Sequence, residues 1–262
     1  MSKTKIEYVD LTINPVVGCS KCSPGCDNCY AERFAARLSK NPQTAAKYAG
    51  VVDAKGKWTG KINVDLSCFD KLPKNPQRIF IGSMTDIFHE NVHYDVLMSV
   101  FSSLLYHAEH TRHTFILLTK RSAHMREFIT DLRPSKTFRN IVLSVTAEDQ
   151  QRADERIPDL LAIPGNWTRA VSIEPMLGAI DLNKLELICK TWRRELTIGT
   201  YLDWVICGGE TGPGARPMHP DWVRNLRDQC QAAGVPFFFK GMIENGKKTR
   251  LLDGREWNEV PE

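Results

Sequence analysis

The sequence predicts an α/β fold in which short parallel strands alternate with helices. Six short runs of residues recur along the chain, and each is almost continuously apolar rather than alternating, which is typical of strands buried on both faces of a parallel sheet. Helical patterns separate the runs, and this alternation indicates βαβ units. A polar residue follows nearly every run. We therefore predict a parallel (β/α) barrel, partial or complete, of about six to seven strands, with a doubly wound open sheet as the alternative.

The predicted elements follow one another in a regular order along the chain. Strands are expected at residues 78–82, 114–119, 140–145, 169–173, 204–208 and 236–239, with a first strand near 11–17. Helices are expected between them, for example at 95–107, 123–132, 149–161 and 221–233. We predict a single domain over residues 1–262, with a polar insertion around 45–60 and a short C-terminal extension at 241–262.

The composition is usual for a soluble globular protein. Hydrophobic residues make up 42% of the 262 residues and charged residues 25%, which is close to the average for such domains. The net charge of +4 permits contact with nucleic acid without demanding it. The sequence has no run of about 18 apolar residues, so we expect no membrane contact. No apolar targeting stretch follows the first residues, and we expect a cytoplasmic location.

Half of the eight cysteines lie within eleven residues, at Cys19, Cys22, Cys26 and Cys29. Disulfides suit small secreted chains with weak cores, which this chain is not. A structural zinc site usually takes two separate pairs of ligands, whereas these four thiols share one loop, so zinc is the alternative. Iron–sulfur clusters commonly draw several ligands from one short run. The arrangement therefore favours an iron–sulfur cluster. The other cysteines are isolated, at Cys68, Cys189, Cys207 and Cys230.

Polar residues directly follow the predicted strands. In a parallel barrel the C-terminal ends of all strands open onto one face, where the chemistry takes place. The alternative is that polar residues follow strands because loops are solvated. The candidate residues on this face lie at the ends of the predicted strands or just after them. In chain order they are Gly82, Ser83, Thr85, Asp86, Lys120 with Arg121, Ser144, Glu148, Glu174, Cys207 and Lys240.

The spacing of Cys22, Cys26 and Cys29 resembles the CxxxCxxC signature of radical S-adenosylmethionine enzymes. Residues 14–32 resemble more closely a phage- and prophage-encoded branch of that superfamily, which is best known as a family of unknown function. In that branch the first ligand lies seven residues before the second, which corresponds to Cys19 here. The ligand triad is therefore either Cys19 or Cys22 together with Cys26 and Cys29. Many members have an aromatic residue before the last cysteine; this chain has Asn28 there and Tyr30 after it.

This resemblance implies a [4Fe–4S] cluster that binds S-adenosylmethionine and generates a 5′-deoxyadenosyl radical. It also implies an external one-electron donor such as flavodoxin or ferredoxin. The phage branch, and a loose likeness to spore photoproduct lyase near residues 83–88, suggest a nucleic acid or a modified nucleobase as substrate, as in phage DNA modification or repair in the host cytoplasm. The reaction class, whether isomerase, lyase or transferase, stays open. The alternative function is a non-catalytic barrel, stabilised by zinc or a cluster, that binds nucleic acid or a partner.

The resemblance, together with the chemistry of the side chains, suggests roles for single residues. Oxygen atoms of Ser83, Thr85 and Asp86, after Gly82, would accept from the amino group of S-adenosylmethionine, or would begin a helix instead. Lys120 with Arg121 would meet its carboxylate or a substrate phosphate, or would be a solvated basic pair. Ser144 and Glu148 would bind its ribose, or Ser144 would be a small core residue. Glu174 would hold ribose or substrate, or would form an ion pair with Lys240 or Arg216. Cys207 would donate a hydrogen atom, or would be a core residue. His89 would carry protons, or would make a local contact. We place Tyr30 among the cofactor-binding candidates, and Glu174, Cys207 and Lys240 among the catalytic ones.

Overall fold

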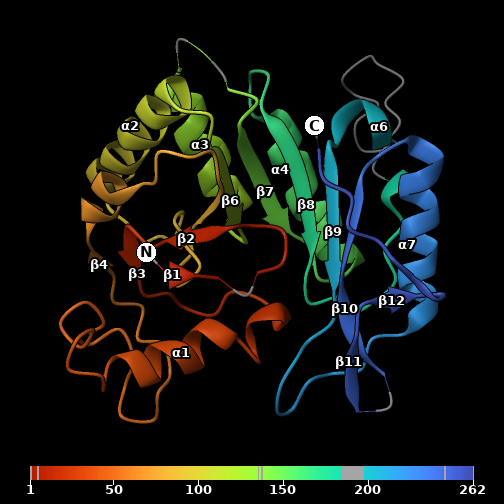
Figure 1. Ribbon diagram of the computed structural model, residues 1–262, viewed down its shortest axis with the longest axis horizontal. Coiled ribbons are helices and arrows are strands. Elements are labelled where there is room, and N and C mark those ends of the chain that lie inside the picture. Colours follow the sequence, from red (N-terminus) through yellow and green to blue (C-terminus); the bar gives the residue numbers. More distant parts are fainter. Residues whose placement is uncertain are drawn as a thin grey trace. The chain divides into compact units, whose positions relative to one another are not determined.

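The structure is a computed structural model that describes residues 2–4, 6–134, 136, 138–184, 198–244 and 246–261 (Figure 1). Cys189 lies outside these residues. The chain forms two compact units: the first contains Met1–Val142 and Gly165–Trp167, and the second contains Leu143–Pro164 and Thr168–Glu262. The single domain stays a prediction.

The first unit combines a mostly parallel set of strands with three helices. Its strands follow the order β1 (Ser2–Lys3), β2 (Leu11–Ile13), β5 (Arg78–Ile81) and β6 (Thr114–Thr119). The pairs β2–β5 and β5–β6 are parallel, and β1 is antiparallel to β2. The short strands β3 (Val16–Val17) and β4 (Asn63–Val64) form a separate antiparallel pair. The helices are α1 (Tyr30–Leu38), α2 (Tyr94–His110) and α3 (Ser122–Leu132), and the 3-10 helices are η1 (Pro24–Cys26) and η2 (Leu66–Lys71).

The second unit also combines mostly parallel strands with helices. Its strands follow the order β8 (Thr168–Ile173), β9 (Trp204–Gly208), β10 (Phe237–Glu244) and β11 (Lys247–Thr249). The pairs β8–β9 and β9–β10 are parallel, and β11 returns antiparallel to β10. A further strand, β7 (Ile141–Thr146), spans the boundary between the units along the chain. The other elements are α4 (Gln150–Ala162), η3 (Leu182–Lys184), α6 (Ile198–Tyr201), α7 (Pro220–Ala233), β12 (Leu251–Leu252) and β13 (Arg255–Glu256).

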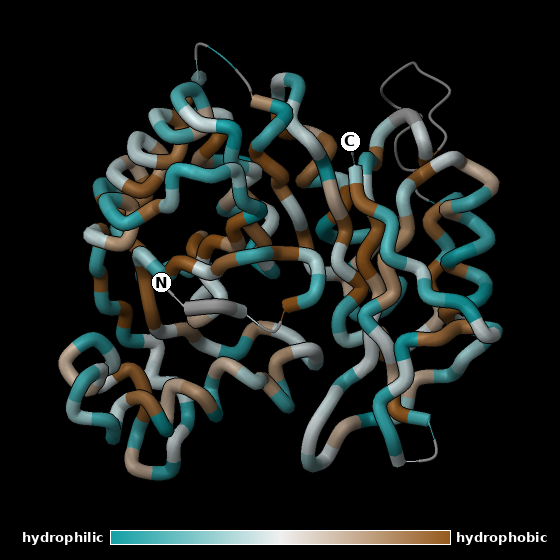
Figure 2. Tube along the Cα trace, viewed as in Figure 1, coloured by the Kyte–Doolittle hydropathy of each residue, from teal (hydrophilic) through white to brown (hydrophobic). Residues whose placement is uncertain are grey.

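These elements confirm the α/β class with mostly parallel strands. All six apolar runs are strands, and β6, β7, β8 and β9 are buried over most of their length. Hydrophobic residues predominate along β6, β7 and β9 (Figure 2). The four predicted helices are present with ends shifted by at most a few residues. Both ends of α7 have residues that are typical of helix termini. Pro220 stands in its first turn, and Gly234 closes it at φ +68°. The (β/α) barrel stays a prediction.

Two predicted segments differ in detail. The first strand, expected near 11–17, is two short strands, because β2 ends at Ile13 and β3 begins at Val16. Pro15 has no N–H to donate to a neighbouring strand, and the Asn14 side chain bonds to another loop instead. The C-terminal segment folds back onto β10, since the Phe239 N–H donates to the Trp257 carbonyl at 2.8 Å.

Candidate iron–sulfur site

The cysteine loop, residues 18–29, runs from the end of β3 to the start of α1. Cys29 is the N-cap residue of α1, so the helix begins directly after the last cysteine. The loop begins at Gly18, whose φ is +107°. A Cβ atom there would lie 2.0 Å from the Lys61 carbonyl oxygen. Only glycine fits this position, because the conformation and the close approach both exclude a side chain.

A second loop, residues 82–86, follows β5 and holds the start of the cysteine loop. The Gly18 N–H donates to the Met84 carbonyl at 3.2 Å. In return, the Thr85 hydroxyl donates to the Gly18 carbonyl at 2.7 Å. Gly82 begins this second loop at φ +86°, where a Cβ atom would lie 2.9 Å from Ile87. The C-terminal end of β5 therefore positions the first cysteine.

Two residues that flank the cysteine loop bind Ser83 and Met84. The Asn14 side chain, after β2, accepts from the Met84 N–H at 2.9 Å and donates to the Ser83 hydroxyl at 3.1 Å. The Tyr30 hydroxyl donates to the Ser83 carbonyl at 2.8 Å. Tyr30 follows the last cysteine, so both ends of the cysteine loop are fixed to the same short segment. Sequence analysis missed Asn14, whose position between β2 and Pro15 was the available signal.

Asp86 is buried and accepts hydrogen bonds on both carboxylate oxygens. Its Oδ1 accepts from the Thr119 hydroxyl at 2.7 Å and from the Phe88 N–H at 3.1 Å. Its Oδ2 accepts from the Lys120 N–H at 3.0 Å and from Arg121 Nη1 at 3.2 Å. The carboxylate thus joins the ends of β5 and β6. The predicted contact between Asp86, Ser83 or Thr85 and an amino group stays a prediction, and all three side chains have partners within the chain.

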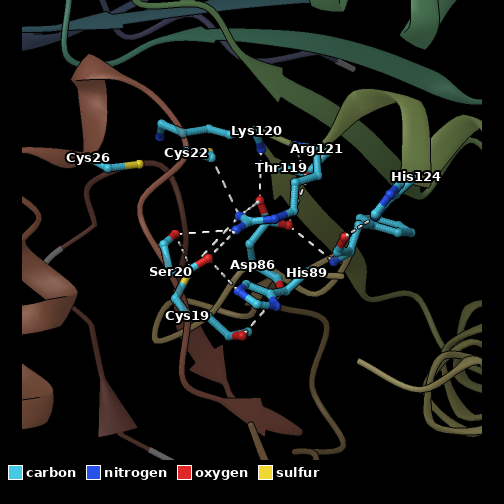
Figure 3. Close-up of polar contacts among 12 residues, drawn as sticks. Cys19, Ser20, Cys22, Cys26, Asp86, His89, Thr119, Lys120, Arg121 and His124 are labelled. Atoms are coloured by element: carbon cyan, nitrogen blue, oxygen red, sulfur yellow. Dashed lines mark hydrogen bonds and ion pairs between the residues drawn. The ribbon is translucent and has the colours of Figure 1, made fainter. Parts of the chain in front are cut away.

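Arg121 occupies the centre of the site, between the cysteine loop and the strand ends (Figure 3). Its side chain is only 8% exposed. The guanidinium donates to the Asp86 and Glu90 carboxylates, and its Nη2 donates to the Ser20 hydroxyl at 2.9 Å and to the Ser20 carbonyl at 3.3 Å. A guanidinium in this position binds the cysteine loop directly, whereas the sequence suggested either a contact with substrate or cofactor or a solvated basic pair.

Two of the four thiols lie against the same guanidinium nitrogen. Arg121 Nη1 is 4.0 Å from Cys19 Sγ and 3.8 Å from Cys22 Sγ. A positive charge at this distance favours the thiolate form, which is the form that binds metal ions and iron–sulfur clusters. Both candidates for the third ligand therefore meet the same cation, and the choice between them stays open.

The thiols differ in how readily they ionise. The pKa of Cys26 is lowered to about 5, first by a hydrogen bond from Cys22 and further by the charge of Lys120. The pKa of Cys22 is raised by the same hydrogen bond and by burial. Burial and the Asp86 charge raise the pKa of Cys19 to about 12. Within the described residues, no three His, Cys, Asp or Glu side chains converge in the arrangement of a formed metal site.

His89 is buried next to the site and makes local contacts. Its Nδ1 accepts from the Asn91 N–H at 3.0 Å, so in the neutral ring the proton is on Nε2. That Nε2 lies 2.7 Å from the Ser20 hydroxyl. Burial and the Arg121 charge lower the pKa of His89. The contacts match the local role that was weighed against proton transfer, and they add a third anchor to the cysteine loop.

The predicted residues of the second unit form their own group of contacts. The Glu174 carboxylate pairs with the Lys240 ammonium, as one of the sequence alternatives proposed. Gly208 lies between the two, where a Cβ atom would be 3.1 Å from Lys240 Cβ and 3.6 Å from Glu174 Cγ. The absence of a side chain at 208 lets the ion pair form across β9. Arg216 pairs with Glu210 within its own loop.

The other predicted residues of this unit are deeply buried. Glu148 is fully buried and accepts from Arg156 Nη1 at 2.9 Å. Cys207 is also fully buried, its Sγ lies 3.7 Å from Met176 Sδ, and burial raises its pKa well above the usual value. Ser144 Oγ is buried and has no hydrogen-bond partner among the described residues. The burial of Ser144 and Cys207 matches the alternative of a core residue, and the proposed ligand contacts of all three residues stay predictions.

A protein family matches almost the whole chain. The family model described as "Protein of unknown function (DUF5131)" covers residues 3–261. Neither the curated proteins nor the solved structures that were searched gave a significant match. No helix in the described part of the chain is long and apolar enough to cross a membrane.

Proposed function

The chain belongs to the DUF5131 family of proteins of unknown function, and we propose that it is a radical S-adenosylmethionine enzyme. One observation carries the proposal: the loop with four cysteines is fixed to the C-terminal ends of the parallel strands β2, β5 and β6 by Asn14, the 82–86 loop and Arg121. In α/β folds this end of a parallel sheet is where ligands bind and chemistry takes place.

The side chains of the cysteine loop fit an iron–sulfur cluster. Cys19, Cys22, Cys26 and Cys29 supply four soft sulfur ligands from one short segment, as iron–sulfur loops do. All four are at least partly exposed, and none is in a disulfide. A [4Fe–4S] cluster held there would supply the electron that cleaves S-adenosylmethionine to methionine and a 5′-deoxyadenosyl radical.

The residues around the loop have two tasks under this proposal. Arg121 places a buried positive charge beside two cysteine sulfurs, which offsets the negative charge that bound thiolates carry. Asp86 fixes that guanidinium and the Lys120 backbone to the same point. Outer contacts of this kind orient ligands and tune a metal centre. The protein thus holds the ligands in place and controls the charge around them.

The proposal also includes a substrate class and a redox partner. We propose a nucleic acid or a modified nucleobase as the substrate class, in keeping with the resemblance to the phage branch. We also propose a one-electron donor such as flavodoxin or ferredoxin. Ser144, Glu148, Glu174, Cys207 and Lys240 of the second unit remain candidates for contact with substrate or cofactor.

The proposal is tested by anaerobic reconstitution with iron and sulfide, followed by reduction with dithionite in the presence of S-adenosylmethionine. We expect the parent protein to form 5′-deoxyadenosine and Cys26→Ala to form none. Matched Cys19→Ala and Cys22→Ala variants identify the third ligand, because only the ligand variant loses the product. A colourless protein that contains one zinc ion per chain and forms no product would contradict the enzyme hypothesis. It would favour the alternative, a zinc-stabilised protein that binds nucleic acid or a partner.

A further inference from the structure

The positive charge of the chain is concentrated in one segment, residues 19–61. This segment contains eight lysines and arginines against three acidic residues, a formal net charge of +5, whereas the whole chain carries +4. The remainder of the chain is therefore close to neutral. The cations are Lys21, Arg33, Arg37, Lys40, Lys47, Lys55, Lys57 and Lys61.

Most of these cations are free to meet a ligand. Lys47 pairs with Asp65, and Lys57 and Lys21 lie 3.0 and 4.0 Å from Glu32. The other five are exposed, and within the described residues none forms an ion pair: Arg33, Arg37, Lys40, Lys55 and Lys61. Glu32 is buried and pairs with Lys57 and Lys21, and the Asp53 carboxylate accepts two backbone N–H groups of its own turn, so neither acid pairs with these five cations.

Two aromatic rings are exposed beside these cations on α1. Tyr30 is 49% exposed and Phe34 is 46% exposed, with ring centroids 6.3 Å apart. The Arg37 guanidinium lies 4.5 Å from the centre of the Phe34 ring. Exposed rings next to unpaired cations are the combination with which proteins bind single-stranded nucleic acid: bases stack on the rings and phosphates meet the charges.

The α1 helix and the 45–61 segment, which carry six of the eight cations, pack against each other (Figure 1). The Glu32 carboxylate of α1 accepts from the Trp58 N–H at 3.0 Å. Trp58 also packs on the apolar cluster formed by both elements, which contains Tyr48, Val51 and Ala35. Trp58 therefore serves packing, and the exposed rings are Tyr30 and Phe34. We call this layer, with its five unpaired cations and two rings, the basic α1 layer.

We propose that the basic α1 layer binds single-stranded nucleic acid. Arg33, Arg37 and the nearby lysines meet the phosphates, and Phe34 and Tyr30 stack on bases. An acidic protein would use the charges but would leave the exposed rings without a planar partner, so the rings favour nucleic acid. This inference rests on the proposed function, and it deepens that function by naming the form of the substrate and the surface that holds it.

The test is fluorescence anisotropy on the metal-free protein with labelled DNA and RNA strands of about 16 nucleotides and with a DNA duplex of the same length. Affinity is measured between about 50 and 200 mM salt. We expect the single strands to bind at least tenfold more tightly than the duplex. The double variant R33S/R37S is expected to weaken binding at least tenfold and to reduce the slope of log K against log salt by about 1.4, as the loss of two phosphate contacts requires.

Two further variants separate stacking from charge. Phe34→Leu keeps an apolar side chain and is expected to weaken single-strand binding severalfold with the salt slope unchanged. The control K247S/K248S removes two exposed cations of β11 and is expected to bind like the parent protein. Equal loss in R33S/R37S and in the control would overturn the proposal, because binding would then depend only on total charge.

Other outcomes also contradict the inference. Absence of single-strand binding, or a duplex bound as tightly as the single strand, overturns it. An R33S/R37S variant that binds single strands like the parent but loses reduction by flavodoxin assigns the layer to an acidic protein instead. If the parent protein forms 5′-deoxyadenosine with dithionite but binds no single strand, the binding proposal fails and the proposed enzyme activity stands. If the parent protein binds single strands but forms no 5′-deoxyadenosine, the proposed enzyme activity fails and the binding surface stands.

Discussion

Arg121 Nη1 donates to Asp86 Oδ2 at 3.2 Å, and both side chains are less than one-tenth exposed. The same nitrogen lies within 4.0 Å of two thiols of the cysteine loop. One buried ion pair therefore connects the ends of β5 and β6 with the segment that carries four cysteines. The contact gives the site a charged centre that is independent of any bound group.

Asp86→Ala is expected to destabilise the protein by about 3 kcal/mol, because it leaves the Arg121 charge buried with one carboxylate fewer. It also leaves the Thr119 hydroxyl and two backbone N–H groups without their acceptor. Urea unfolding measures the change. Asp95→Ala, at an exposed position in the first turn of α2, is the control and is expected to change the free energy of unfolding by less than about 1 kcal/mol. An Asp86→Ala variant as stable as Asp95→Ala would show that the ion pair does not contribute to stability.

Gly18→Ala is expected to destabilise the fold more than Gly246→Ala. Both glycines have positive φ, at +107° and +74°. A Cβ atom at 18 would overlap the Lys61 carbonyl, whereas one at 246 has no neighbour within 4 Å. The control therefore measures only the cost of the conformation, about 1 kcal/mol. Equal unfolding free energies for the two variants would show that the approach of Gly18 to Lys61 imposes no constraint.

Part of the stability depends on pH through Glu90. The hydrogen bond from Arg121 lowers the pKa of Glu90 to about 2, below the value of about 4.3 in an unfolded chain. Because the unfolded state binds the proton first as the pH falls, this contribution is complete above about pH 4.3 and is lost towards pH 2. The side chain is half exposed, so solvent limits the effect to about 1 kcal/mol.

Glu90→Gln tests this dependence by urea unfolding at several pH values. We expect the variant to lose stability less steeply than the parent protein between about pH 4.3 and pH 2. Parallel curves for the two proteins would mean that Glu90 does not contribute to the acid sensitivity.

Cys26 is expected to be the most reactive thiol of the metal-free protein at neutral pH, because its pKa is lowered to about 5 and it is partly exposed. Iodoacetamide labelling followed by peptide mapping measures the order of reaction. Cys207 is fully buried and is the unreactive control. Faster labelling of Cys19, whose pKa is raised to about 12, would contradict the assignment of the thiolate.

The sequence predicted the strands and helices well because their signals are local. Apolar runs such as that of β6 and end signals such as Pro220 and Gly234 involve only neighbouring residues. The first strand was predicted as one segment because its β character continues past Asn14, and only Pro15 marks the break.

The site was predictable as a set of residues but not as a set of contacts. The cysteines and the residues after β5 and β6 were identified from spacing and position. Their pairing was not, because Arg121 and Cys19 are 102 residues apart and no local pattern connects them. Glu148 was likewise predicted as a ligand contact, since its partner Arg156 on α4 becomes visible only when strand and helix pack together.

We propose that the cysteine loop holds a [4Fe–4S] cluster that binds S-adenosylmethionine. Electron paramagnetic resonance of the reconstituted, dithionite-reduced protein, with and without S-adenosylmethionine, detects both the cluster and its ligand. We expect the signal of a reduced [4Fe–4S] cluster in the parent protein, a change in that signal when S-adenosylmethionine is added, and no signal in Cys26→Ala. A cluster signal that S-adenosylmethionine leaves unchanged, or a protein that binds zinc in place of iron and sulfide, would contradict the account.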